Sequence, residues 1–335
     1  MNEFPILDVS SWPTYSEEQV GSKRKRWLFG RDGNRWLVKF PRPRSGEHWA
    51  EVVAAAVCEL LRIPHAEVEL AMLHGESCTV SRSFLRDTML VPGNLILGNA
   101  LLATTIEGYD AKAQKPAHHS VEAVLALLAS PDIGPPACVD PPPGVAAAPD
   151  FFVAYLMLDA LIGNTDRHHE NWGVELRLHA DPILVAAVLQ ALGMPTGMGP
   201  LGPRPIGPTH VLAPTFDHAS SLGRNLGDDE RSERLTTRDQ GRTVEHYCTR
   251  GRSPLYARGG STSLTVRQSF ELARACRPGC ADAWIDRLAA TADSDLLAIV
   301  DRLPAHIASG PARAFAKAVL TSGRRFLLSL RSPYS

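Results

Sequence analysis

Polar side chains gather in one short stretch of the chain, residues 163–173, which reads Gly-Asn-Thr-Asp-Arg-His-His-Glu-Asn-Trp-Gly. Asp166 and Asn171 stand five residues apart within it. A carboxylate such as that of Asp166 can orient a substrate hydroxyl or accept its proton, and the amide oxygen of Asn171 can ligate a metal ion. The preceding residues, 151–162, are apolar with helical spacing, and Gly163 breaks that helix. We therefore expect a functional loop anchored by a buried helix, the alternative being a helix end whose polar residues only cap it.

Transfer of a phosphoryl group from ATP needs a cation on the phosphates, oxygen ligands for magnesium and a carboxylate near the attacking hydroxyl. The chain holds these parts in the order in which protein kinases hold them, and Asp166 and Asn171 have the spacing of the kinase pattern His-Arg-Asp-x-x-x-x-Asn. Lys39 lies between two apolar residues of a predicted strand, and Glu51 on the next helix is its expected partner. Asp217 follows a short predicted strand and is expected to bind magnesium together with Asn171.

A short basic loop precedes the first strand of a predicted hairpin, where a nucleotide-covering loop should lie. Backbone N–H groups of such a loop can hold phosphate, and Lys25 adds a charge. The loop has a single glycine, and its basic residues would also fit a solvated hairpin face. The residues expected to contact nucleotide here are Gly21, Ser22, Lys23, Arg24 and Lys25.

The elements that must position these residues follow from the hydrophobic pattern. Strands at 26–30 and 35–40, joined by Asp-Gly-Asn, predict a hairpin, and a helix at 48–61 is ended by Pro64. Further strands are expected at 67–73 and 77–85. Further helices are expected near 120–130, 150–162, 183–192, 266–277, 281–291, 294–303 and 311–330.

Three segments lack such a pattern. Residues 131–149 and 193–208 are rich in Pro or Gly and are predicted to be loops, and residues 224–262 are predicted to be a mobile polar excursion on the surface. The whole pattern predicts an α+β, two-lobed protein with a kinase-like fold. A small β-rich N-lobe (1–90) would carry the covering loop, the Lys strand and the helix, and a larger helical C-lobe (91–335) would carry the catalytic and metal-binding loops.

Composition narrows the class of protein further. The 335 residues include 35 basic and 36 acidic side chains, so no global field would draw the chain to nucleic acid or to an anionic membrane. The six cysteines form no Cys-x-x-Cys pair, the start lacks a secretory signal, and no apolar stretch approaches the roughly 20 residues of a membrane span. We expect a cytoplasmic protein without direct nucleic-acid binding and without a membrane partner.

The sequence resembles the HipA-like kinases, bacterial Ser/Thr kinases best known as toxins of toxin-antitoxin pairs. The resemblance rests on residues 163–173, 213–221, 37–40 and 80–84. It implies that Asp166 is the catalytic carboxylate and that Asn171 and Asp217 hold magnesium. The nucleotide-binding residues that it implies, besides the covering loop and its autophosphorylation candidate Ser22, are Lys39, Glu51, Ser81, Arg82, Ser83, His168, His169, Glu170, Asn171, Phe216 and Asp217.

The function implied by this resemblance is an ATP- and Mg2+-dependent Ser/Thr protein kinase, with a protein substrate and, if it is a toxin, a small antitoxin partner. Two alternatives use the same parts: a kinase-fold enzyme that phosphorylates a lipid or small-molecule hydroxyl, and a nucleotide-binding regulator without turnover. Since the covering loop begins near residue 21, the N-terminal subdomain of the longer toxins has no room, which predicts a short, core-only member. The stretch at 193–208 is predicted to be an insertion before Asp217.

Overall fold

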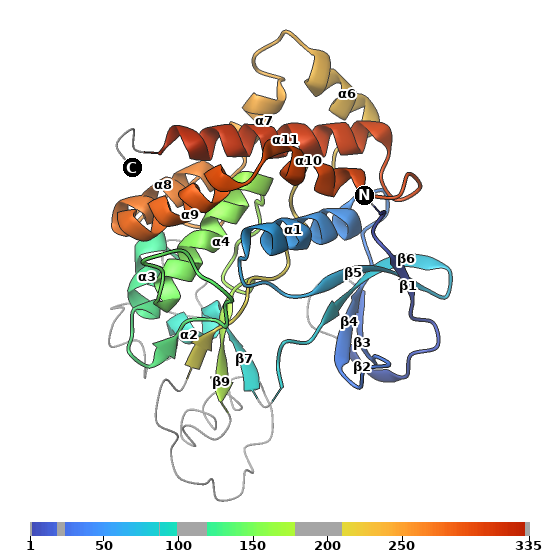
Figure 1. Cartoon of the computed structure of the whole chain (residues 1–335), viewed down its shortest axis with the longest axis horizontal. Coiled ribbons are helices and arrows are strands. Elements are labelled where there is room, and N and C mark those ends of the chain that lie inside the picture. The colour runs from blue at the N-terminus through green and yellow to red at the C-terminus, as the bar shows by residue number, and fades with distance from the viewer. Residues whose placement is uncertain (1, 19–23, 87, 99–118, 178–209, 332–335) are drawn as a thin grey trace, which may run out of the picture.

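The chain passes from a strand-rich N-terminal part into a helical C-terminal part, coloured from blue to red in Figure 1. The computed structural model describes residues 2–18, 24–86, 88–98, 119–177 and 210–331. The predicted helix at 183–192 and the predicted loop at 193–208 lie outside these ranges, as do Gly21, Ser22 and Lys23.

A six-stranded sheet forms the N-terminal part, in the order β1-β5-β6-β4-β3-β2. Its strands are β1 (Ile6–Asp8), β2 (Thr14–Glu18), β3 (Lys25–Phe29), β4 (Arg35–Lys39), β5 (Val68–Leu73) and β6 (Glu76–Arg82). All neighbours are antiparallel except β1 and β5. The predicted hairpin is β3 and β4, turned by Gly33 at φ 73°, a left-handed conformation that favours glycine.

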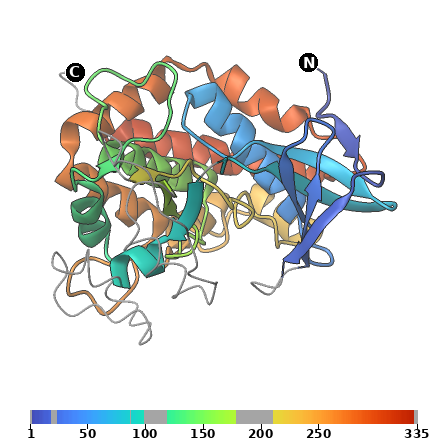
Figure 2. The same cartoon turned by 90° about the horizontal axis from the view of Figure 1, so that it is seen from below.

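Helix α1 (Glu47–Leu61) joins the sheet to the helical part. It packs on β5 and β6 on one side and on α10 (Asp293–Asp301) on the other. Figures 1 and 2 show it between the two parts. Its apolar side chains belong to the same core as those of the C-terminal helices, so the position of α1 is fixed by packing from both parts.

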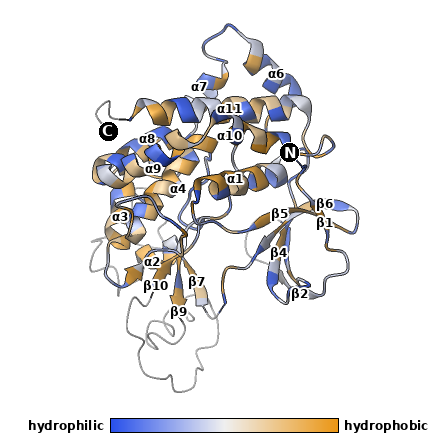
Figure 3. Ribbon diagram, viewed as in Figure 1, coloured by the Kyte–Doolittle hydropathy of each residue, from blue (hydrophilic) through white to orange (hydrophobic). Residues whose placement is uncertain are grey.

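The central helix of the C-terminal part is α4 (Ala148–Ile162), which is buried along its whole length and largely orange in Figure 3. A helix that is apolar on all sides can only lie inside a core. It packs against α3 (Val121–Leu128), α8 (Val266–Cys276), α9 (Pro278–Ala290) and α11 (Gly310–Ser329). These helices and α10 lie within a few residues of their predicted bounds. Within the described ranges, no helix has the length and apolarity to cross a membrane.

A second sheet of four short strands lies below α4, and the sequence pattern predicts only one strand in this region, the short strand before Asp217. Its order is β7-β9-β10-β8, and α2 (Gly93–Gly98) follows directly on β7. The strands are β7 (Thr88–Pro92), β8 (Ile133–Gly134), β9 (Gly173–Arg177) and β10 (His210–Leu212). β8 and β10, with two and three residues, are too short to show an alternating pattern.

The prediction of an unstructured excursion at 224–262 is wrong. This segment contains α6 (Asp228–Thr236) and α7 (Val244–Arg250), and both pack on α11, as the upper part of Figure 1 shows. Polar contacts hold them: the buried Arg231 guanidinium lies 2.8 Å from an Asp228 oxygen and donates to the Gly223 carbonyl at 3.0 Å. A hydrophobic pattern cannot reveal helices that are anchored by arginine.

Candidate active site

A cavity of about 730 Å³ lies between the six-stranded sheet and the helical part. One side, here called the sheet wall, is formed by β3, β4 and β6. The opposite side, the loop wall, is formed by the 163–173 loop and the 213–223 segment. The chain from residue 83 to 95, with β7 and α2, closes one end. The predicted site residues that line the cavity are Lys25, Lys39, Ser81, Arg82, Ser83, Asp166, His168, Glu170, Asn171, Phe216 and Asp217.

Lys39, on the last position of β4, is the central cation of the cavity. Its Nζ lies 2.8 Å from Glu51 Oε1 of α1 and 3.3 Å from Asp217 Oδ1 of the loop wall. Burial by itself would lower the pKa of Lys39, but the Asp217 and Glu51 carboxylates outweigh burial and raise the pKa. The ammonium is therefore charged at every physiological pH and is held at the point where the two walls meet.

The 163–173 loop is built around a buried charge. Gly163 ends α4 at φ 65°, and the chain then turns so that Arg167 points into the interior, fully buried. Its Nε and Nη2 donate to the two carboxylate oxygens of Asp159, both at 2.8 Å, and its Nη1 donates to the Asn171 carbonyl at 2.7 Å. Because Arg167 faces inward, the residues on either side of it, Asp166 and His168, face the cavity.

Asp166 and Asn171 are linked across the loop. The Asn171 amide nitrogen donates to the Asp166 backbone carbonyl at 2.6 Å. This bond directs the Asn171 side-chain oxygen away from that carbonyl and leaves it available as a ligand. The carboxylate of Asp166 is 43% exposed, accepts a hydrogen bond from Ser220 Oγ at 3.2 Å, and lies 3.8 Å from His168 Nε2.

The 213–223 segment holds Asp217 opposite Lys39. Its backbone pairs with the connection between α1 and β5, since Thr215 N–H donates to the Pro64 carbonyl and Ala66 N–H to the Thr215 carbonyl, both at 2.9 Å. Asp217 itself has φ 58°, the left-handed conformation that aspartate tolerates better than most residues. A non-glycine residue in that conformation is often found where geometry serves function.

The residues of the cavity fit ATP with magnesium. The loop wall offers one carboxylate, Asp217, and one amide oxygen, Asn171, and Mg2+ commonly takes one or two protein oxygens and completes its shell with water and phosphate. Within the described ranges, no three His, Cys, Asp or Glu side chains form a metal cluster, so a metal held by protein side chains alone is not indicated there. Lys39 adds the cation that the phosphates need.

Asn94, which the sequence analysis does not single out, also lines the cavity. Its backbone N–H donates to the His169 carbonyl at 3.1 Å, which ties α2 to the 163–173 loop. Its side-chain Oδ1 is buried, and no described residue donates to it. An unsatisfied acceptor in a cavity wall fits a ligand that brings its own donor, such as a sugar hydroxyl.

Some described residues that were predicted to contact nucleotide do not line the cavity. Arg24 pairs with Glu76 and lies over the Phe40 ring, with 3.8 Å from Cζ to the ring centroid. The His169 ring packs edge-on against His119, with their centroids 5.8 Å apart. Glu51 reaches the cavity only through Lys39.

Two further residues line the cavity: Arg42, which the sequence analysis does not single out, and Phe84, which ends the 80–84 segment of the resemblance. Arg42 follows the Lys strand directly in a proline-rich connection, and its guanidinium lies 3.3 Å from Glu47 Oε1 at the start of α1. Phe84 faces Phe216 with ring centroids 6.0 Å apart, so two aromatic rings flank the end of the cavity near β6. Apolar faces of this kind suit a nucleobase.

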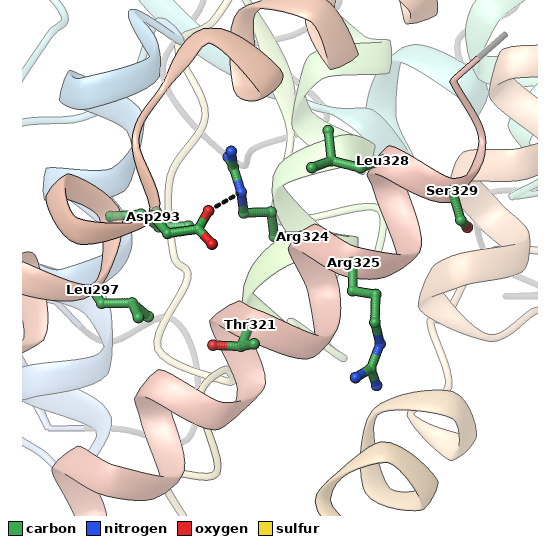
Figure 4. A pocket seen from close by; sticks show the side chains of 8 residues that line it. Asp293, Leu297, Thr321, Arg324, Arg325, Leu328 and Ser329 are labelled. Atoms are coloured by element: carbon green, nitrogen blue, oxygen red, sulfur yellow. Dashed lines mark ion pairs between the residues drawn. The ribbon is translucent and has the colours of Figure 1, made fainter. Parts of the chain in front are cut away.

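A second hollow of about 560 Å³ lies between α10 and α11 (Figure 4). Its arginines are already engaged: Arg324 pairs with Asp293 and Arg325 with Glu245, each at 2.5 Å. No lysine lines the hollow, and its one lining carboxylate, Asp293, is paired with Arg324. The chemistry therefore belongs to the cavity between the two walls.

No protein-family model matches the sequence, and no curated protein matches it. Solved structures do match. The chain is similar to the Helicobacter pylori proinflammatory kinase CtkA, with a TM-score of 0.66 and 18% identity over 97% of this chain and 100% of CtkA. It also matches HipA of Shewanella oneidensis MR-1, solved with HipB and operator DNA, with a TM-score of 0.45 and 11% identity over 97% of this chain and 67% of HipA.

A third match is the FAT and kinase domain of CtTel1, with a TM-score of 0.41 and 15% identity over 94% of this chain and 21% of that one. The likeness to CtkA confirms the predicted α+β, two-lobed kinase-like fold. HipA of a toxin-antitoxin system is among the solved structures that the chain matches. At 18% identity the likeness concerns the fold, and the chemistry has to be argued from the cavity's own residues.

Proposed function

We propose that this protein is an ATP- and Mg2+-dependent kinase that phosphorylates a Ser or Thr hydroxyl of a protein. The observation that carries the proposal is the convergence of four side chains on one cavity of a kinase fold: Lys39, Asp166, Asn171 and Asp217. A protein that only bound nucleotide would have no need of a carboxylate directed at an acceptor hydroxyl beside the metal ligands.

Each residue has a role that follows from its position. Lys39 would contact the phosphates, and Ser81, Ser83 and Phe84 would border the base. Asn171 and Asp217 would hold Mg2+, which neutralises charge on the phosphates when it is bound. Asp166 would orient the acceptor hydroxyl and take its proton as the hydroxyl oxygen bonds to the γ-phosphorus and ADP leaves.

The sheet wall and the loop wall would approach the nucleotide from opposite sides. Lys39 Nζ is shared between Glu51 and Asp217. If Asp217 held the metal, Lys39 would keep Glu51 as its partner and would face the phosphates. The antitoxin partner, the boundary of the lobes near residue 90 and the cytoplasmic location stay predictions.

Labelled ATP tests the proposal directly. The purified chain is incubated with γ-labelled ATP and Mg2+, alone and with cell lysate, beside Asp166→Asn and the exposed control Asp229→Asn. We expect label in protein bands, lost at least about 100-fold in Asp166→Asn and unchanged in Asp229→Asn. Label found only in lipid or small-molecule fractions would favour the alternative substrate class, and transfer that survives Asp166→Asn would refute the role of Asp166.

A further inference from the structure

The two carboxylate oxygens of Asp166 have different surroundings. Oδ2 accepts a hydrogen bond from Ser220 Oγ at 3.2 Å, whereas Oδ1 lies 3.8 Å from His168 Nε2, beyond a direct hydrogen bond. Asp166 is 43% exposed toward the cavity, and Ser220 is only 8% exposed. One oxygen is therefore engaged by the protein, and the other is open to a ligand.

The Ser220 hydroxyl is held in place by the backbone. Thr165 N–H donates to the Ser220 carbonyl at 3.2 Å, and Leu222 N–H donates to the Ile162 carbonyl at 3.0 Å. The first bond ties Ser220 itself to the 163–173 loop, and the second ties the chain two residues later to the end of α4. The hydroxyl thus reaches Asp166 from 54 positions away in the sequence with little freedom to move.

We propose that Ser220 is a positioning residue for Asp166, which fixes the carboxylate with Oδ2 engaged and presents Oδ1 to the acceptor hydroxyl. This inference rests on the proposed function. The Asp χ2 torsion is broad and roughly two-fold, so a half-exposed carboxylate without a partner samples many orientations. A hydrogen bond from a rigid donor selects one of them, and a catalytic base that is displaced by a fraction of an ångström loses rate.

Ser220 does not fit the role of a phosphate acceptor. Its side chain is buried, its own carbonyl and the N–H of Leu222 are held by backbone hydrogen bonds, and a phosphate on Oγ would lie against the Asp166 carboxylate, where like charges repel. The neighbouring Ser221 offers a matched control. It is buried as well, but its hydroxyl donates to the His218 carbonyl at 2.8 Å and does not reach Asp166.

The test compares Ser220→Ala, Ser220→Thr, Ser220→Cys and Ser221→Ala with the wild type. It measures kcat and KM for phosphoryl transfer, the Kd for Mg2+ and ATP, and the melting temperature. We expect Ser220→Ala to lower kcat about 10- to 100-fold while KM and Kd for ATP change less than about threefold. The reason is that Ser220 acts only on the catalytic carboxylate of Asp166 and does not contact the nucleotide. Ser220→Thr should restore kcat to within about fivefold, and Ser221→Ala should keep it within about threefold.

Ser220→Cys keeps the side-chain volume but donates weakly, so it separates the hydrogen bond from packing if the alanine variant does not fold. Its kcat should lie between those of the wild type and Ser220→Ala. A kcat unchanged in Ser220→Ala or Ser220→Cys, an equal loss in Ser221→Ala, or phosphate on Ser220 by mass spectrometry would overturn the inference alone. A wild type that binds Mg2+ and ATP but transfers no phosphoryl group would overturn the proposed function and the inference with it.

Discussion

The two walls of the cavity reach their geometry by different physical means. The sheet wall is a ladder of backbone hydrogen bonds, in which β4 pairs with β3 on one side and β6 on the other. The loop wall contains no regular element at the site, and its shape depends on the buried Arg167 and Asp159 and on backbone bonds between the 163–173 loop and the 213–223 segment.

The two walls should therefore be destabilised by different kinds of substitution. A strand ladder keeps its register when one exposed side chain is changed, because the backbone makes the bonds. A loop that is folded around one buried ion pair is strongly destabilised when either partner is removed, since the other charge stays buried and unpaired. Loss of the buried Arg167 charge should thus lower the stability strongly, whereas loss of an exposed charge of the sheet wall should lower it little.

The largest contrast is expected between Arg167→Met and Arg82→Met. Arg167 is fully buried against Asp159, so its loss should lower the free energy of unfolding by about 3 to 5 kcal/mol. Arg82 is 37% exposed and pairs with Asp32 and Glu67, each at 3.3 Å, so its loss should cost about 1 kcal/mol or less. Urea unfolding of both variants measures this, and equal losses would mean that the two walls are not built differently.

A second contrast concerns nucleotide affinity within the sheet wall. Lys39 and Lys25 face each other in the register of β4 and β3, but the structure places Lys39 between Glu51 and Asp217. Lys39→Met should weaken ATP binding about 30- to 100-fold, because a buried cation is lost. Lys25→Met should weaken it about threefold or less, since Lys25 is partly solvated. Isothermal titration gives both dissociation constants. A larger effect for Lys25→Met would mean that the phosphates bind beside Lys25 and not beside Lys39.

A smaller effect is expected on how the free energy of unfolding depends on pH, and it comes from the buried His119. His119 accepts a hydrogen bond from Trp172 Nε1 at 3.0 Å and contacts the Pro254 carbonyl through Nδ1 at 3.0 Å. Burial, which the Pro254 carbonyl opposes only in part, lowers the pKa of His119 to about 3, from about 6.5 in an unfolded chain. Between these values the unfolded state binds a proton that the folded state does not, so stability falls as the pH falls.

His119→Gln should remove part of this dependence. From pH 7 to pH 4.5 the wild type should lose about 2 kcal/mol more unfolding free energy than the variant. Urea unfolding at several pH values measures the difference. Parallel pH profiles for the two proteins would show that His119 is not held neutral by the fold.

Side-chain chemistry predicted much of what lines the cavity. The spacing of Asp166 and Asn171 marks a loop after a buried helix, and Lys39 between two apolar residues marks an inward-facing cation. In the structure both features lie on the cavity, and Glu51 lies 2.8 Å from Lys39. Such residues can be recognised because a polar or charged group among apolar residues costs free energy to bury unless it has a partner or a ligand.

The rest could not be predicted because its signals are not local. Ser220 reaches Asp166 only through backbone bonds between segments that are far apart in sequence, and Asn94 faces the cavity only because β7 pairs with β9. Helices α6 and α7 are held by arginine contacts together with a few apolar side chains, such as Leu235 and Tyr247, that show no helical repeat in the sequence. No periodicity in the sequence encodes these contacts.

The most direct test of the central claim is the dependence of ATP binding on magnesium. Isothermal titration of the full chain with ATP, with and without Mg2+, is compared for the wild type, Asp217→Ala and the exposed control Asp229→Ala. The account predicts at least about tenfold tighter binding with Mg2+ in the wild type and the control, and loss of that gain in Asp217→Ala. Equal binding with and without Mg2+ in the wild type would contradict it.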